Sequence, residues 1–451
     1  MHLGGGLAHV GNRIVAVSGN GALYLVTWNE ARDHIVASRL PVSRPVDLSA
    51  FESVITTNPA EAVRVQDLVA RATDDGWELF VSHHIWDEQA HCVSVAVSAV
   101  VLVEDLSRVV RDWRRVVTTQ PCLAADRNDH GEGFQGLLSG GRMEWITPDR
   151  LLITIGDHGW DSVARQVAAA QLDDYDYGKV RILEPDSGRL LPFTKGHRNP
   201  QGLYIDPNGR IWSTEHGPRG GDELNLLVDG GNYGWPFFTL GSDYASLDWR
   251  PALNPPSTIA NTGPVHAWLP SVGISALIGI QGDALPRWKG DMVAASLVGK
   301  ALQRIRLNGD EVQFVESIPV GLRVRDLIES PTGELWLWTD LGEIATLREA
   351  GAAAKNANAF VACSSCHEIT AGQAGGLGPN LSGVMGRPIA SQAEFTAYSK
   401  GLSRVGGDWT EERLDAFLRD PATFAPGSTM YFRVPDPEIR ASVVAFLRSV
   451  R

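Results

Sequence analysis

Short runs of β-branched and aromatic residues, broken by Gly, Asp, Asn and Pro, recur from the start of the chain to about residue 348. Runs such as RIVAVSGNGALYLVTW, WELFVSHHIW, RLLITIGDHG and GELWLWTDLGEIATL have the composition of strands, and Asp206-Pro-Asn-Gly209 has that of a turn. About 350 residues of four-stranded units suit a β-propeller, which usually has roughly 4–8 blades. A pair of large β-sandwiches is the alternative that this pattern leaves open.

The pattern changes to small residues and then to helix signals at Ala350-Gly-Ala-Ala-Ala-Lys355. We therefore predict two domains: an all-β propeller over residues 1–348 and a small all-α domain over residues 358–451, joined by a linker over 349–357.

Two helix starts can be placed in the second domain. Thr410 is followed by Glu411 and Glu412, which is typical of a capped helix with acids at its positive end. Asp436 as cap and Pro437 in the first turn predict a last helix. Its predicted apolar face consists of Ile439, Val443, Val444 and Leu447.

Composition limits the class of protein. With 43% hydrophobic and 21% charged residues, a chain of 451 residues can bury a sizeable core. Residues 351–451 hold 10 Lys and Arg against 9 Asp and Glu, so the first 350 residues carry a net charge of −14, which argues against a nucleic-acid partner. No apolar run is long enough to span a bilayer. The opening lacks the pattern of a secretion signal, so we expect that a leader was removed or that the N-terminus is truncated.

The motif Cys363-Ser-Ser-Cys366-His367 places two thiols one helical turn apart, directly before an imidazole. Both thiols can add to the vinyl groups of one haem while the imidazole binds its iron. A tetrahedral zinc site would need two more ligands, yet no Cys or His follows His367. A thioredoxin-type redox pair would lie in a βαβ pattern, which is absent. The motif therefore predicts a c-type haem.

The sixth iron ligand should be a soft or nitrogenous side chain, and the domain offers Met385 and Met430. We predict Met430, because it lies 63 residues after His367 in a loop before the last helix and can reach the opposite haem face. Met385 is expected to be a packing residue. Residues 356–451 resemble class I c-type cytochromes in CSSCH, Gly378-Pro-Asn-Leu381 and PGSTM, which implies electron transfer by a low-spin haem.

The other two cysteines, Cys92 and Cys122, could form a disulfide or remain as buried thiols; the sequence leaves both readings open.

A cytochrome domain fused to a larger domain usually accepts electrons from it, so the propeller should hold a redox cofactor. No GxGxxG lies between a strand and a helix, which removes the usual nicotinamide or flavin fold. Instead, GHRNPQG (196–202), EHGPRGGDE (215–223) and NYGWP (232–236) form polar, turn-rich loops suited to an anionic ligand and a hard cation. Ordinary loops between blades are the competing interpretation.

These three motifs resemble the soluble quinoprotein glucose dehydrogenases of the glucose/sorbosone dehydrogenase family over about residues 120–345. The resemblance implies a six-bladed propeller that binds pyrroloquinoline quinone (PQQ) and calcium and oxidises aldose sugars. Carried over by position, it implies quinone contacts and calcium-binding carbonyls. The quinone contacts are Arg198, Asn199, Ser271, Arg323 and Arg325, and the carbonyls are those of Gly217 and Pro218.

Two departures from the family pattern bear on the chemistry. The His that serves the family as general base is replaced by Leu138, although Asp157, which would orient it, is retained. We expect Asp157 to take over as base, and His130, Glu132 and His158 are further candidates; the alternative is that Asp157 is a turn residue that accepts backbone hydrogen bonds. Arg198 and calcium are expected to polarise the quinone. The family's Lys after the Ser-Leu pair is displaced, and we expect Lys300 to replace it.

Together these features predict a PQQ-dependent dehydrogenase for an aldose sugar or related alcohol, with electrons passing from the quinone to the chain's own haem. An external acceptor such as another cytochrome or the respiratory chain would follow. Covalent haem attachment and quinone loading imply a periplasmic or secreted bacterial protein. One alternative is that the propeller has no dehydrogenase activity and serves as a binding or docking module for the cytochrome. Another is a calcium-dependent lactonase, which would leave the cytochrome unexplained.

Overall fold

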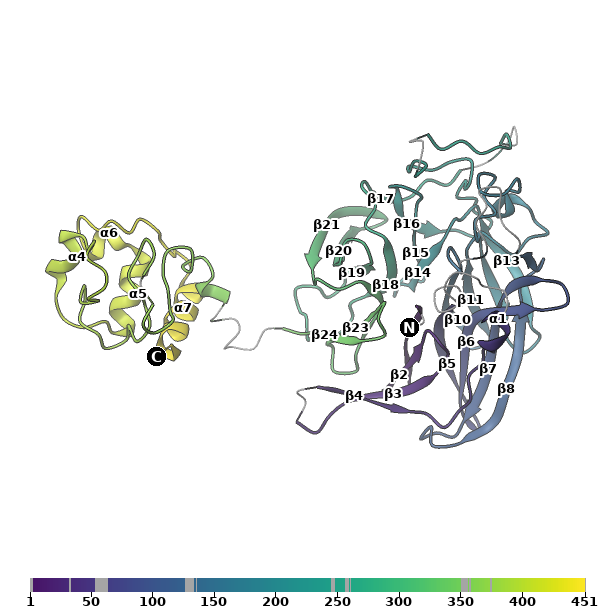
Figure 1. The fold of residues 1–451 in the computed structure, drawn as a ribbon, viewed down its shortest axis with the longest axis horizontal. Helices are drawn as coiled ribbons and strands as arrows, with labels where there is room; N and C mark the ends of the chain where they lie inside the picture. Colours follow the sequence, from purple (N-terminus) through teal and green to yellow (C-terminus); the bar gives the residue numbers. More distant parts are fainter. Residues whose placement is uncertain are drawn as a thin grey trace. The chain divides into compact units, whose positions relative to one another are not determined.

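The computed structural model describes residues 3–31, 34–52, 64–125, 134, 136–244, 248–255, 259, 261–349, 356, 358–373 and 375–450. They belong to two compact units, Met1–Arg348 and Glu349–Arg451 (Figure 1).

The described residues of the first unit form six antiparallel sheets, each built from strands that are consecutive in the chain. The first three sheets are β1 (Gly5–Val10), β2 (Arg13–Ser18), β3 (Leu23–Trp28) and β4 (Ile35–Arg39); β5 (Val65–Thr73), β6 (Gly76–Asp87), β7 (Cys92–Leu102) and β8 (Val109–Thr118), with β9 (Leu123–Ala124) beside β7; and β10 (Gly140–Thr147), β11 (Arg150–Ile155), β12 (Lys179–Glu184) and β13 (Arg189–Lys195).

The remaining sheets are β14 (Pro200–Ile205), β15 (Ile211–Glu215), β16 (Asp222–Leu227) and β17 (His266–Trp268); β18 (Ile274–Gly279), β19 (Met292–Ser296), β20 (Ala301–Asn308) and β21 (Glu311–Pro319); and β22 (Val324–Glu329), β23 (Leu335–Thr339) and β24 (Ile344–Leu347). Two short helices, α1 (Ser49–Glu52) and the 3₁₀ helix η1 (Ala169–Gln171), lie in connections.

The first strand of each sheet contacts the first strand of the next, and β22 contacts β1, so the ring closes. This is a six-bladed β-propeller, as predicted, and the sandwich alternative is wrong. Burial follows the position of a strand in its blade. All of β7 is buried, whereas the outer strands β8 and β21 are largely exposed.

A buried ion cluster joins the inner strands. Arg142 on β10 lies 2.9 Å from a carboxylate oxygen of Asp67 on β5 and 2.8 Å from one of Asp326 on β22. Its Nε donates to the carbonyl of Gln201 on β14, and Asp326 accepts the backbone N–H of Leu7 on β1. The cluster therefore ties five of the six blades together, including the first and the last.

The second unit is helical, as predicted, and contains α4 (Lys400–Val405), α5 (Glu411–Arg419), α6 (Pro421–Phe424) and α7 (Pro437–Ser449). The Thr410 side chain caps α5 and that of Asp436 caps α7, so both predicted helix starts are confirmed. In the part of the chain that the structure describes, every helix is too short or too polar to cross a bilayer.

One detail of the predicted apolar face of α7 is wrong. Val443, Val444 and Leu447 are buried, but Ile439 is 47% exposed, and Arg440 is buried in its place. The Arg440 guanidinium donates to the carbonyls of Val434 and Pro435 and to Asp415, so its burial is compensated by hydrogen bonds.

Candidate functional site

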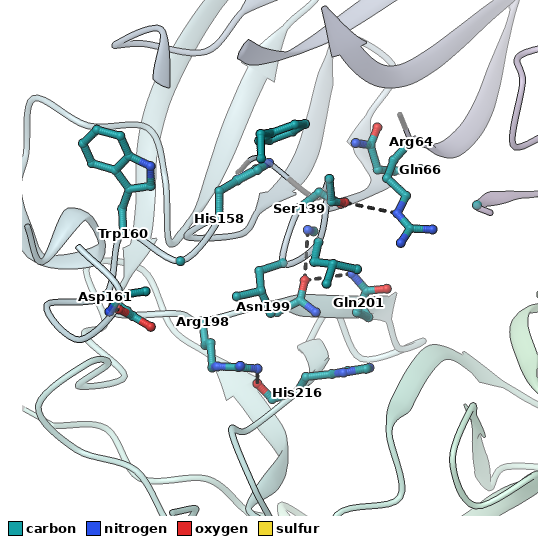
Figure 2. Close-up of a pocket in the computed structure, with 18 of the residues that line it drawn as sticks. Arg64, Gln66, Ser139, His158, Trp160, Asp161, Arg198, Asn199, Gln201 and His216 are labelled. Atoms are coloured by element: carbon teal, nitrogen blue, oxygen red, sulfur yellow. Dashed lines mark hydrogen bonds between the residues drawn. The ribbon is translucent and has the colours of Figure 1, made fainter. Parts of the chain in front are cut away.

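A cavity of about 780 Å³ opens in the propeller, lined by loops and strand ends of several blades (Figure 2). The described residues that line it include six arginines and three aspartates, although the chain as a whole is acidic. The arginines are Arg64, Arg142, Arg165, Arg198, Arg323 and Arg325, and the aspartates are Asp161, Asp243 and Asp340.

Arg198 lies two residues before the start of β14, and both its backbone and its side chain form hydrogen bonds. Its backbone N–H donates to a carboxylate oxygen of Glu215. Its guanidinium Nη1 donates to the carbonyl oxygens of Gly217 at 2.7 Å and His216 at 3.3 Å, and the guanidinium carbon lies 5.4 Å from the centroid of the Trp235 ring. The structure therefore brings the predicted quinone-binding arginine to one of the two predicted calcium-binding carbonyls.

Asn199 is fixed by its side-chain oxygen, which accepts from the backbone N–H of Gly140 at 3.1 Å and from Nε2 of Gln201 at 2.9 Å. All three residues line the cavity. Asn199 is consequently oriented before any ligand binds.

Gly217 and Pro218, in the loop after β15, are not among the described residues that line the cavity, but they accept hydrogen bonds from Arg198 and Tyr244, which are. The Pro218 carbonyl accepts from the hydroxyl of Tyr244 at 3.1 Å, and the Gly217 N–H donates to Asp222 at 3.1 Å. The Ser271 hydroxyl donates to the same Asp222 carboxylate. Ser271 is not among the described residues that line the cavity.

Lys300 also lies outside the described lining. It is an exposed residue with a φ of 48° in the turn between β19 and β20, and its carbonyl accepts from the N–H groups of Val320 and Gly321.

Arg323 and Arg325 share one carboxylate. Nε of Arg323 donates to one oxygen of Asp340 at 2.9 Å, and Nε of Arg325 donates to the other at 2.6 Å. Burial alone would raise the pKa of Asp340, but Arg325 and Arg323 bring it below its ordinary value. The pair therefore presents a net positive charge to the cavity.

Asp157 is completely buried and is not among the described residues that line the cavity. Its carboxylate accepts from Trp235 Nε1 at 2.6 Å and from the Gly159 N–H at 2.9 Å. Burial, with a contribution from nearby Asp161, raises its pKa to about 8. Its neighbour His158 does line the cavity, as does Leu138.

The other two base candidates, His130 and Glu132, lie outside the described residues.

Sequence reasoning missed several residues that line the cavity, among them Gln66, Gln201 and His216. Gln201 and His216 lie inside the GHRNPQG and EHGPRGGDE motifs, so those motifs were the available signal. Gln66 comes from β5, in another blade, and nothing local in the sequence marks it.

The chemistry of the cavity fits an anionic quinone. Nε of Arg198 and Nε2 of His216 are buried and have no hydrogen-bond partner among the described residues. Leaving a buried polar group unpaired costs about 1–3 kcal/mol, which a ligand can recover. The volume lies within the range of roughly 300–1,000 Å³ that is usual for ligand sites.

The donors available to a metal ion are consistent with calcium. No cluster of three or more His, Cys, Asp and Glu side chains suited to a metal ion occurs within the described ranges. The Gly217 and Pro218 carbonyls are hard oxygen donors of the kind that calcium prefers.

A second cavity, of about 480 Å³, lies within the C-terminal unit and brings together Cys363, Cys366, His367 and Met430. Met385 is not among its described lining residues and packs against the helical core.

The imidazole of His367 is oriented by the backbone. Its Nδ1 lies 2.8 Å from the carbonyl of Pro379, so Nε2 is the nitrogen that could bind an iron ion. Burial lowers the pKa of His367 and so keeps it neutral. A Cβ on Gly378 would lie 2.2 Å from the ring, which explains the glycine of the GPNL motif. These residues fit a covalently bound haem.

Cys92 and Cys122 form a disulfide, which resolves the alternative that the sequence left open. Disulfides persist in oxidising compartments, so the bridge is consistent with an extracytoplasmic location.

The two units are similar to different known proteins. Residues 73–348 match the family described as Glucose / Sorbosone dehydrogenase. An aldose sugar dehydrogenase of Escherichia coli (strain K12) is 31% identical over 250 residues, which cover 53% of this chain and 64% of that protein. A cytochrome c homolog of Rickettsia conorii is 41% identical over 88 residues, 19% of this chain and 50% of the relative. The chain thus spans less than two thirds of the length of these curated relatives.

Solved structures agree. A crystal structure of a glucose dehydrogenase matches with a TM-score of 0.62 and 26% identity, covering 78% of this chain and 97% of the other. The PQQ-bound aldose sugar dehydrogenase of Streptomyces coelicolor shares the fold, with a TM-score of 0.52 and 19% identity over 77% of this chain and 94% of the other. The chain therefore belongs to the glucose/sorbosone dehydrogenase family and carries a C-terminal region similar to cytochrome c.

Proposed function

We propose that the protein is a PQQ- and calcium-dependent dehydrogenase that oxidises an aldose sugar or a related alcohol and passes the electrons to its own c-type haem. An external acceptor, such as another cytochrome or the respiratory chain, would reoxidise the haem. The observation that carries the proposal is the convergence of Arg198, Asn199, Arg323 and Arg325 on one cavity.

The cavity residues divide into two groups by what they would hold. Arg198, Arg323 and Arg325 would bind the carboxylates and carbonyl oxygens of the quinone, because guanidinium groups pair with such oxygens in fixed geometry. The Gly217 and Pro218 carbonyls would hold calcium once the hydrogen bonds from Arg198 and Tyr244 shift. Roles for Ser271 and Lys300 as quinone contacts, and for Asp157 in catalysis, stay predictions.

When bound, the quinone would supply the acceptor for the two electrons that leave the substrate. The chain's own residues would bind the sugar, exclude water and take up the hydroxyl proton. In the C-terminal unit, His367 and Met430 would hold the haem iron, and a haem with two protein ligands would supply electron transfer rather than oxygen chemistry. The disulfide and the covalent haem support a periplasmic or secreted location.

The test uses the full chain with its haem attached, titrated with PQQ and calcium and then mixed with a panel of aldoses and alcohols. We expect the haem spectrum to change to the reduced form only when quinone, calcium and a substrate are all present. R198M should lose quinone binding, whereas R189M, an exposed arginine paired with Glu184, should retain it. If the wild-type chain failed to bind PQQ, the result would favour the alternative in which the propeller is a non-catalytic docking module for the cytochrome.

A further inference from the structure

His158 lies beside the position at which the sequence lacks its expected base. The His158 backbone N–H donates to the Leu138 carbonyl at 3.1 Å, and the Asp157 N–H donates to the Arg198 carbonyl at 2.9 Å. The segments that carry Leu138 and His158 adjoin the start of β10 and the end of β11, which pair with each other. Leu138, His158 and Arg198 all line the same cavity, and Figure 2 shows His158 and Arg198 around it.

A second imidazole lies behind His158. Nε2 of His84, on β6, is 3.2 Å from Nε2 of His158. Nδ1 of His84 accepts the backbone N–H of Arg64 at 3.1 Å, so in the neutral ring the proton is on Nε2. Nδ1 of His158 lies 3.2 Å from the Gly156 carbonyl and must therefore carry its proton there. His84 thus donates to His158. Nε2 of His158 carries no proton, and its lone pair accepts this hydrogen bond.

The surroundings keep both rings neutral. Phe134 stacks on His158 with ring centroids 6.2 Å apart, and Tyr177 meets it edge-on at 5.4 Å. Burial lowers the pKa of His158 to about 4. Burial, together with the neighbouring His158 and Arg64, lowers the pKa of His84 well below its ordinary value. At neutral pH both rings are therefore uncharged, and Nε2 of His158 carries no proton.

Gln66 could provide a second acceptor for the His84 N–H if its side-chain amide turned over. Its side-chain Nε2 lies 3.4 Å from Nε2 of His84, and its buried Oε1 has no hydrogen-bond partner among the described residues. Rotation of the amide would turn that oxygen toward His84. A substrate hydroxyl could then take over the lone pair of His158 without leaving the His84 N–H unsatisfied.

We propose that His158 is the general base of the dehydrogenation and that His84 and Gln66 are positioning residues for it. The inference rests on the proposed function. When bound, the quinone would take up the hydride from the substrate C–H bond. The hydroxyl proton would pass to Nε2 of His158 as the C=O bond of the product forms. Asp157 is less suited, because both of its oxygens accept internal hydrogen bonds and it lies outside the described cavity lining.

The first experiment compares haem reduction in the PQQ- and calcium-loaded full chain and its variants. H158Q should slow reduction by about 10²–10⁴-fold, the usual contribution of a general base. Calcium-dependent PQQ binding should be unchanged, which separates loss of the base from loss of the cofactor. Free imidazole should restore part of the rate to H158A. H266Q, which alters a half-buried histidine of β17 outside this site, should keep the wild-type rate.

The second experiment reads the ring protonation directly by ¹⁵N NMR of labelled histidines in the full chain without added quinone. We expect His84 to carry its proton on Nε2 and His158 on Nδ1, and H84Q or Q66L to change the His158 signals. The opposite tautomer of His84 would overturn the arrangement even if H158Q failed to fold.

The outcomes separate the two proposals. If the wild-type chain reduces its haem with a sugar and H158Q does so equally fast, the base assignment is wrong while the proposed function stands. Loss of rate in D157N with retention in H158Q would assign the base to Asp157. Absence of haem reduction in the wild-type chain across the whole panel would remove both proposals together.

Discussion

Replacing Arg142 by methionine tests what closes the propeller ring. The side chains of Asp67 and Asp326 are 2% and 4% exposed, and Arg142, itself 12% exposed, is 2.9 Å and 2.8 Å from them. Methionine fills similar space but leaves two buried carboxylates without their cation. Removing one partner of a buried ion pair usually costs about 3–5 kcal/mol. We expect R142M to lower the free energy of unfolding of the propeller by about that amount.

The loss should depend on pH. Burial already raises the pKa of Asp67 to about 7 even with Arg142 present, and removing the cation raises it further. Unfolded aspartate loses its proton at about pH 4, whereas Asp67 in the folded variant keeps its proton to a higher pH. The folded variant therefore binds more protons than the unfolded chain in this range, and its stability falls as the pH rises. The destabilisation by R142M should therefore be larger at pH 8 than at pH 5.

Urea unfolding followed by tryptophan fluorescence measures the propeller, while haem absorbance follows the C-terminal unit as an internal reference. R189M is the matched control, since the Arg189 side chain is 66% exposed and lies 3.5 Å from Glu184; exposed pairs contribute about 0–1 kcal/mol. If R142M unfolded at the same urea concentration as R189M, the buried cluster would not be what holds the blades together.

Three further predictions concern other parts of the chain. Lys179 is buried and donates to two carbonyls, and burial lowers its pKa to about 7. Between pH 7 and 10 the unfolded chain therefore binds more protons than the folded chain, so the stability of the propeller should rise with pH. In urea titrations, K179M should not show this rise. M430A should convert the haem to a high-spin spectrum and lower its reduction potential, whereas M385A should leave the spectrum as in the wild type; retention of the low-spin spectrum in M430A would refute Met430 as ligand. C92S should destabilise the propeller by about 3–4 kcal/mol, because the bridge to Cys122 spans 30 residues of sequence, and reductant should have no additional effect on the variant.

The sequence was most informative where structure is built from neighbours in the chain. Each blade consists of consecutive strands, so alternating strand and turn signals were enough to predict a propeller. The predicted haem-binding residues likewise come from one short motif and a late loop, and they line one cavity. The helix caps at Thr410 and Asp436 depend on local hydrogen bonds, and both predictions were correct.

Contacts between distant segments could not be predicted in this way. His84 and His158 lie 74 residues apart, and only the packing of β6 against the loop after β11 brings their rings together. The Arg142 cluster joins residues from different blades for the same reason. On α7, the apolar pattern favoured burial of Ile439, but hydrogen bonds to carbonyls near the helix start made burial of Arg440 favourable instead.

The central claim is that electrons from a sugar reach the haem through a quinone held in the propeller cavity. Rapid mixing of the full, haem-containing chain with PQQ, calcium and an aldose, while the haem spectrum is recorded, tests it most directly. We expect haem reduction that requires all three additions and is lost in R198M. Tight, calcium-dependent PQQ binding without haem reduction by any sugar or alcohol, or haem reduction by sugar without PQQ, would contradict it.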